Sequence, residues 1–158
     1  MSKRARKAIL SMLLWFWAGG VYFFIEVLWK TLRGRPDAIS WTMFLLAIIL
    51  AIPLERCGAE MKWETPLWVQ GLVCGTAITA AELAAGLVLN VWLGLGVWDY
   101  SGLWGNFLGQ VCPQFWLLWC FGSIPSIVIL DWLRYAVEGG ERPVSYTHLR
   151  AHETGRNL

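Results

Sequence analysis

Residues 67–91 read LWVQGLVCGTAITAAELAAGLVLNV, an apolar stretch whose one acidic residue is Glu82. Small or polar residues recur in it at spacings of three or four, which places them on one face of an α-helix. They are Gly71, Gly75, Thr79, Glu82, Gly86 and Asn90. The remaining side chains suit lipid, so the pattern predicts a membrane helix packed in a bundle, with an acid held in the interior.

The composition of the whole chain also favours a membrane protein. Of its 158 residues, 57% are hydrophobic and 15% are charged, and its twelve Trp residues are of a type that gathers at membrane interfaces. The net charge of +2 is too small to indicate a nucleic-acid partner. The four Cys residues show no CxxC spacing, so we expect small hydrophobic residues rather than metal ligands or disulfides.

The C-terminal tail reads as a sequencing artefact. Residues 144–154, VSYTHLRAHET, match one reading frame of a transposase adapter used in shotgun libraries. We therefore expect residues 144–158 to be an artefactual tail and residues 1–143 to form a single integral membrane domain. Both histidines, His148 and His152, fall in this tail and are not taken as a metal pair.

Apolar segments predict the membrane spans. They cover residues 8–29, 39–54, 67–91 and 111–133. The first is expected to be an uncleaved span rather than a signal peptide, because its apolar run continues through Trp29. The second is near the lower length limit, with Pro53 in its last turn, and is either a short tilted span or a re-entrant segment. Pro125 should kink the fourth helix or free a carbonyl there.

The predicted fold class is an all-α membrane protein, a bundle of about four transmembrane helices. Residues 92–110, which join the third and fourth helices, are rich in Trp and Gly and carry Asp99 as their only charge. This connection is expected to lie at the membrane interface or to form a sheltered re-entrant turn. Four crossings with the N-terminus inside put eight Lys and Arg residues inside and three outside. The positive-inside rule then places both termini in the cytoplasm.

Beyond these patterns, a set of residues from Trp68 onward forms a recognisable signature. Its members are Gly75, Thr79, Glu82, Gly86, Asn90, Trp98, Asp99, Tyr100, Ser101, Asn106, Gly109 and Gln110. With them the chain resembles the putative ABC-transporter type IV, or CmpB-like, family of small bacterial membrane proteins. Glu26, in the aromatic run YFFIE, also fits, and the resemblance covers most of residues 15–135. It implies a multi-pass protein of the bacterial cell membrane. Where many members carry a proline after the WDYS run, this chain reads GLWG, so the turn there is expected to differ.

Glu82 is the main candidate for a functional residue. A carboxylate inside a membrane is unfavourable unless it is neutralised, paired or hydrated, so such acids often mark function. Thr79 and Asn90 share its helix face and are candidates to hydrogen-bond it or to help coordinate a cation. Glu26 either pairs with Lys30 at i+4 or approaches Glu82, where two acids would share a proton or hold a cation. The alternative for Glu82 is a structural hydrogen bond between helices.

Other residues have simpler expected roles. Gly71, Gly75 and Gly86 should allow close helix packing rather than act in gating. Asp99 is expected to form a local Asx turn rather than to face a cation. Asp131 is expected to pair with Arg134, three residues further along the fourth helix.

Missing motifs narrow the function. The sequence has no GxxxxGK[ST] motif, no zinc pattern and no histidine outside the tail, so we expect no enzyme, no catalytic residue, no metal and no cofactor. The predicted function is a permease-like component of a transport system in the lipid bilayer. It would act as a homo-oligomer or with another membrane subunit, and any ATPase would be a separate protein. The alternative is a non-transporting scaffold or regulatory subunit that binds another membrane protein through the glycine face.

Overall fold

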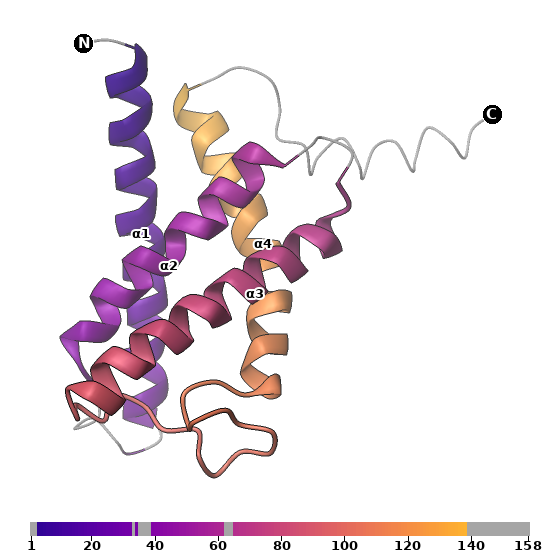
Figure 1. The fold of residues 1–158 in the computed structure, drawn as a ribbon. Coiled ribbons are helices and arrows are strands. Elements are labelled where there is room, and N and C mark those ends of the chain that lie inside the picture. Colours follow the sequence, from indigo (N-terminus) through magenta and orange to yellow (C-terminus); the bar gives the residue numbers. More distant parts are fainter. Residues whose placement is uncertain (1–2, 33, 35–38, 62–64, 139–158) are drawn as a thin grey trace.

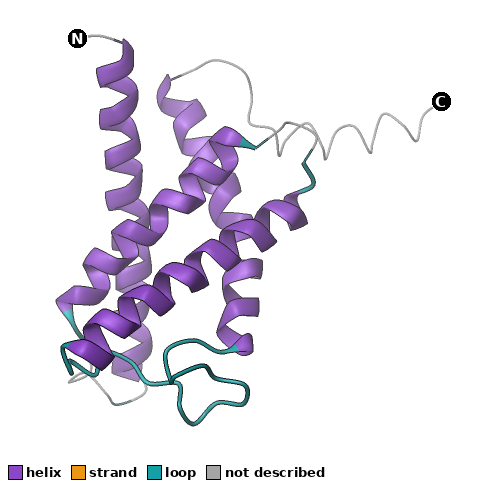
Figure 2. Ribbon diagram, viewed as in Figure 1, coloured by secondary structure: helices purple, strands orange, loops and turns teal. Residues whose placement is uncertain are grey.

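The computed structural model describes residues 3–32, 34, 39–61 and 65–138, which form an all-α bundle (Figure 1). Its α-helices are α1 (Lys3–Leu32), α2 (Trp41–Glu60), α3 (Leu67–Gly86) and α4 (Pro113–Glu138). A short π-helix, η2 (Leu87–Trp92), continues α3. Within these described residues the helices are joined by loops and there is no strand (Figure 2). The predicted fold class is therefore confirmed, while the expected tail, residues 144–158, lies outside the described residues.

The helices run alternately in opposite directions (Figure 1). One end of the bundle, called here the N-terminal end, holds the start of α1, the end of α2, the start of α3 and the end of α4. The opposite end, called the loop end, holds residues 93–112, which connect η2 to α4. Helix α3 packs mainly against α4, and α1 packs mainly against α2.

Three helical segments of the described chain are long and apolar enough to cross a membrane. They are Arg4–Leu32, Leu67–Trp92 and Pro113–Val137. Many large apolar side chains are exposed along them, as a surface in contact with lipid requires, among them Phe24 and Phe121. The protein is therefore a multi-pass membrane protein.

Helix α2 is longer than the predicted second span. The sequence placed Pro53 in the last turn, but α2 continues through it to Glu60. A proline inside a helix removes one backbone hydrogen bond, a loss that a helix tolerates when tertiary contacts hold the following residues. Glu55 supplies such contacts, because its carboxylate pairs with Arg134 of α4 and accepts a hydrogen bond from the hydroxyl of Ser11 at 3.2 Å.

The partner of Arg134 also differs from the prediction. We expected it to pair with Asp131 on its own helix, whereas the structure pairs it with Glu55, which is 6% exposed. A buried carboxylate needs a counterion more strongly than one nearer the surface, which explains why Arg134 pairs with Glu55 rather than with Asp131. Nη2 of Arg134 also donates to Oγ of Ser11 at 2.8 Å. The Ser11–Glu55–Arg134 cluster thus ties α1, α2 and α4 together at the N-terminal end.

Glycine allows α3 to approach α4 closely. A Cβ atom on Gly75 would lie 2.5 Å from the backbone nitrogen of Cys120, and one on Gly71 would lie 2.8 Å from the carbonyl oxygen of the same residue. Gly86 leaves room for Gln110 of the loop, whose Oε1 would be 2.5 Å from an added Cβ. All three glycines therefore face other parts of their own chain.

The structure agrees only partly with the expectation that the cysteines are small hydrophobic residues without disulfides. Cys112 and Cys120 are buried and free, in keeping with small hydrophobic residues. Cys74 of α3 is disulfide-bonded, contrary to the prediction from spacing. A disulfide requires two cysteines that are close in the folded chain, and spacing along the sequence does not report this.

Gly75→Ala is expected to destabilise the protein by about 1–3 kcal/mol, because the added methyl group would overlap the backbone of α4. Gly122→Ala is the matched control, since an added Cβ there meets no atom within 4 Å. The control should keep or slightly raise the midpoint of thermal unfolding, measured on detergent-purified protein. Equal midpoints for the two variants would contradict the close packing of α3 against α4.

Candidate functional site

The carboxylate of Glu82 is buried near the loop end of α3, where the residue is 5% exposed. Its two oxygens accept hydrogen bonds from different parts of the chain. Oη of Tyr100, in the loop, donates to Oε1 at 3.0 Å, and Nε1 of Trp119, on α4, donates to Oε2 at 2.9 Å. In the described part of the chain no Lys or Arg pairs with Glu82. The acid is thus held by neutral donors.

Aromatic contacts fix both donors in place. The ring of Tyr100 stacks on Phe115 of α4 with centroids 4.4 Å apart and planes 12° apart. The ring of Trp119 contacts Tyr22 of α1 at a centroid distance of 5.6 Å. Burial and the nearby Glu82 carboxylate raise the pKa of the Tyr100 phenol above its ordinary value, so the phenol keeps its proton and donates it to the hydrogen bond.

Glu26, on α1, has its own partner. Its Oε1 is 2.9 Å from Nζ of Lys30, the i+4 pair considered in the sequence. Glu26 is close enough to interact electrostatically with Glu82 and Tyr22. Among the described residues, however, no hydrogen bond joins the two carboxyl groups. The structure therefore brings the two acids into one region without making them share a contact.

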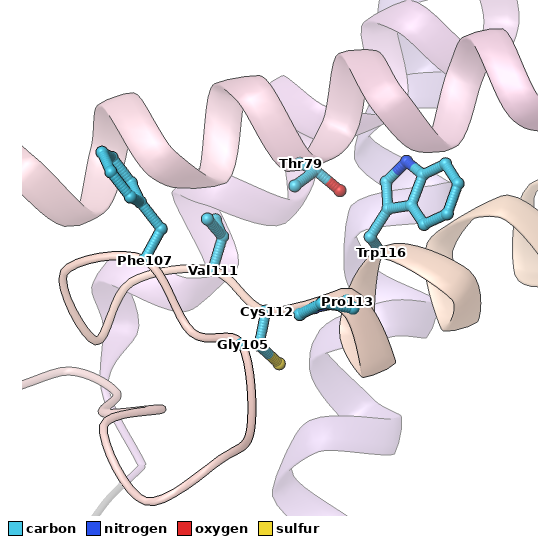
Figure 3. Close-up of a pocket in the computed structure, with 7 residues that line it drawn as sticks. All are labelled: Thr79, Gly105, Phe107, Val111, Cys112, Pro113 and Trp116. Carbon is cyan, nitrogen blue, oxygen red and sulfur yellow. The ribbon is translucent and has the colours of Figure 1, made fainter.

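Thr79 does not bond to Glu82. Its hydroxyl donates to the carbonyl of Gly75 at 2.9 Å, one turn back on α3. A threonine in a helix commonly satisfies its hydroxyl in this way, which turns it away from neighbours on the same face. Thr79 instead lies at the edge of a cavity beside the loop (Figure 3).

Asn90, in the π-helix η2, also bonds to groups other than Glu82. Its Nδ2 donates to Oε1 of Gln110 at 2.7 Å and to the carbonyl of Trp98 at 3.1 Å, and its Oδ1 accepts from the backbone of Val97 at 2.7 Å. Gln110 Oε1 also lies against Gly86, so Asn90 stays on the Gly86 side of the helix but bonds to the loop instead of Glu82. Asn90 fastens the loop to the end of α3.

The signature residues at the start of the loop form its turn. Oδ1 of Asp99 accepts from the backbone of Ser101 at 2.8 Å, and Oδ2 accepts from the Ser101 hydroxyl at 2.9 Å. These bonds form an Asx turn and lower the pKa of the exposed Asp99 carboxyl. Gly109 has a φ of +68°, and its carbonyl accepts from the backbone of Tyr100 at 2.7 Å. The turn thereby holds the residue that reaches Glu82.

Asn106 and Gln110 close the rest of the loop. Nδ2 of Asn106 donates to the carbonyls of Ser101 and Leu103 at 3.1 and 2.8 Å, and its Oδ1 accepts from the backbone of Gly109 at 3.0 Å. Nε1 of Trp98 donates to the carbonyl of Gln110 at 3.0 Å. The conformation of the loop is therefore fixed by its own polar side chains.

A cavity of about 390 Å³ opens between α3, the loop and the start of α4 (Figure 3). Its lining is Thr79, Gly105, Phe107, Val111, Cys112, Pro113 and Trp116. No charged side chain lines it, and Glu82 is not among the lining residues. The cavity and the buried carboxylate are therefore two separate features of the loop end.

Sequence reasoning missed two residues beside Glu82. Trp119 is one of them, and its place inside a predicted span, away from the interfaces where Trp usually gathers, could have marked it. Tyr22 is the other, and it lies one turn before Glu26 on the same helix face. Tyr100 appeared in the sequence only as part of the family signature.

The fold and the site define a helical, multi-pass membrane protein with an acid buried in its interior. The family model described as Putative ABC-transporter type IV matches residues 39–141, more than half of the chain. The chain belongs to this family, as the resemblance indicated. The match includes Glu82, the loop and α4 but not α1, which carries Glu26. No curated protein and no solved structure matches the chain.

Asn90→Ala is expected to release the loop, because it removes the side chain that makes three hydrogen bonds to it. Amide hydrogen exchange across residues 97–110 should accelerate about tenfold or more, as a loss of one to two kcal/mol of local stability implies. Hydrogen-exchange mass spectrometry measures this. Thr79→Val, which removes a hydroxyl bonded only within its own helix, should leave the exchange unchanged. If both variants exchange like the wild type, Asn90 does not hold the loop.

Proposed function

We propose that the protein is a permease-like component of a transport system and that Glu82 is the acidic group of its site. The observation that carries this proposal is the burial of Glu82 between two neutral donors, Tyr100 and Trp119. A buried carboxylate without a counterion is unfavourable and is retained where its proton or charge is used, as with a proton, a metal cation or a cationic group of a substrate. The family description supports a transport context.

Glu26 is proposed as a second acid of the same site. Its electrostatic interaction with Glu82 supports this role, while its pairing with Lys30 makes it the weaker member. Asn90 would act indirectly by fixing the loop that carries Tyr100. Thr79 lines the neighbouring cavity and would contact only a ligand that extends into it.

The partners of the protein and its orientation in the membrane are also part of the proposal. The chain has no nucleotide-binding motif, so the ATPase of an ATP-driven system would be another protein. Four helices enclose little space for a pathway, which favours a homo-oligomer or a second membrane subunit. With four crossings, the N-terminal end would face the cytoplasm of a bacterial cell, because basic residues outnumber those at the loop end eight to three.

The alternative function, a scaffold that binds another membrane protein, requires the glycine face of α3 (Gly71, Gly75 and Gly86) to be accessible to that partner. Gly71 and Gly75 lie against α4 of the same chain, where an added Cβ would overlap Cys120. A partner protein could not use these residues without displacing α4. This contact argues for the transport proposal over a scaffold that binds through the glycine face.

Native mass spectrometry of the detergent-purified protein tests the site. We expect a homo-oligomer or a complex that carries a reproducible non-lipid mass, and Glu82→Gln should abolish that mass while the protein still accumulates in the membrane. Glu60→Gln is the matched control, because Glu60 forms an exposed pair with Arg56 and should bind like the wild type. Retention of the bound mass in Glu82→Gln would refute the role of Glu82.

Glu26→Gln should weaken binding of the same mass less than Glu82→Gln does, because Lys30 already neutralises Glu26. The fraction of protein that carries the bound mass in native spectra is compared between the two variants. Full binding by both would argue against a shared acidic site.

A further inference from the structure

Among the described residues, the Ser11–Glu55–Arg134 cluster contains the one ion pair that joins different helices. The side chain of Glu55 is 7% exposed and that of Arg134 is 23% exposed, and Ser11 bonds to both. Breaking such a pair leaves a buried charge without a partner, which is strongly unfavourable. The cluster therefore holds α1, α2 and α4 together at the N-terminal end of the bundle.

Both partners of the ion pair lie beyond a proline in their helix. Pro53 precedes Glu55 in α2, and Pro125 precedes Arg134 in α4. Each proline removes one backbone hydrogen bond, and helices bend most readily at such points. The end segments of α2 and α4 can therefore swing about the prolines, and the ion pair joins them together with the apolar packing of Leu54 near Leu130.

An apolar layer lies beside the cluster on α1 and α4. Leu10 and Leu14 of α1 pack there against Leu130 of α4, and all three are buried. Ile127, about one turn earlier on α4, is 1% exposed. Packed apolar side chains of this kind exclude water until they separate.

Two buried polar atoms without partners among the described residues lie on the loop-end side of the cluster, one on α4 and one on α1. Ser123 is 3% exposed, and its Oγ has no hydrogen-bond partner among the described residues. It lies one turn from Trp119 on α4, on the same face, and Trp119 donates to Glu82. Nε1 of Trp15, one turn from Ser11 on α1, is also buried without a partner there. Water that entered between the helices would bond to these atoms.

We propose that the Ser11–Glu55–Arg134 cluster is a gate at the N-terminal end, and that its opening gives water and small water-soluble molecules access to Glu82 past Ser123. The gate rests on the proposed function in so far as Glu82 is the site to which it leads. When the ion pair separates, the end segments of α2 and α4 swing about Pro53 and Pro125 and the apolar layer widens. The Ser123 hydroxyl then hydrogen-bonds to water between that layer and the carboxylate of Glu82.

Chemical labelling of Glu82 measures this access directly. A water-soluble carbodiimide with an excess of a small amine converts an accessible carboxyl group into an amide, which peptide mass spectrometry assigns to its residue. Glu55→Gln separates the ion pair with little change in side-chain size, and it should accelerate the labelling of Glu82 about tenfold or more. The double variant Glu55→Arg/Arg134→Glu restores a pair with reversed charges and should return the rate toward that of the wild type.

Arg56→Gln is the matched control, because it breaks an exposed ion pair with Glu60 in the same helix. It should leave the labelling rate unchanged. Equal rates in the wild type and Glu55→Gln would overturn the gate, as would an equal increase in Arg56→Gln or the absence of recovery in the charge-swapped variant. Labelling requires no transport, so these outcomes are independent of whether Glu82→Gln loses its bound mass.

Discussion

An ionisable side chain inside a membrane bundle must obtain its hydrogen bonds from the protein, because lipid supplies none. For Glu82 this requirement is met from two directions. Trp119 reaches it from α4, and Tyr100 reaches it from the loop that follows η2. The first contact requires α3 and α4 to lie close together, which Gly71 and Gly75 allow. The second requires the loop to fold back over the end of the bundle, and the polar residues of the signature hold it there. Helix packing and loop conformation thus both serve the burial of one carboxylate.

Much of this arrangement could be predicted from particular residues. The periodic small and polar face of residues 67–91 identified α3, and the unfavourable burial of an acid singled out Glu82. Contacts between helices could not be predicted, because they depend on the relative rotation and height of two segments that hydrophobic periodicity does not specify. Hence Trp119 was missed, and Arg134 was assigned to its neighbour Asp131 instead of Glu55. Asn90 bonds to the loop rather than to Glu82, because a helix face does not specify which neighbour a polar side chain reaches.

The glycine contacts also bear on how the protein meets its partners. Glycines along a membrane helix are often taken as a surface for another subunit, yet here α4 of the same chain occupies Gly71 and Gly75. The outer surface that remains is mostly large and apolar, with Phe24 and Phe121 among its exposed residues. An oligomer would therefore form through surfaces of that kind, and its interface would leave the hydrogen bonds of Glu82 intact.

The two ends of the bundle are closed by different kinds of contact. At the loop end, neutral hydrogen bonds and a tightly folded turn cover Glu82, and opening there would require many weak bonds to break together. At the N-terminal end, the Glu55–Arg134 ion pair and the hydrogen bonds of Ser11 join described segments of helices that prolines interrupt. One charged contact is easier to switch than a hydrogen-bonded loop, since neutralising or displacing either partner removes most of its strength. Opening at the N-terminal end therefore requires the loss of a charged contact, whereas opening at the loop end requires the loss of a hydrogen-bonded turn.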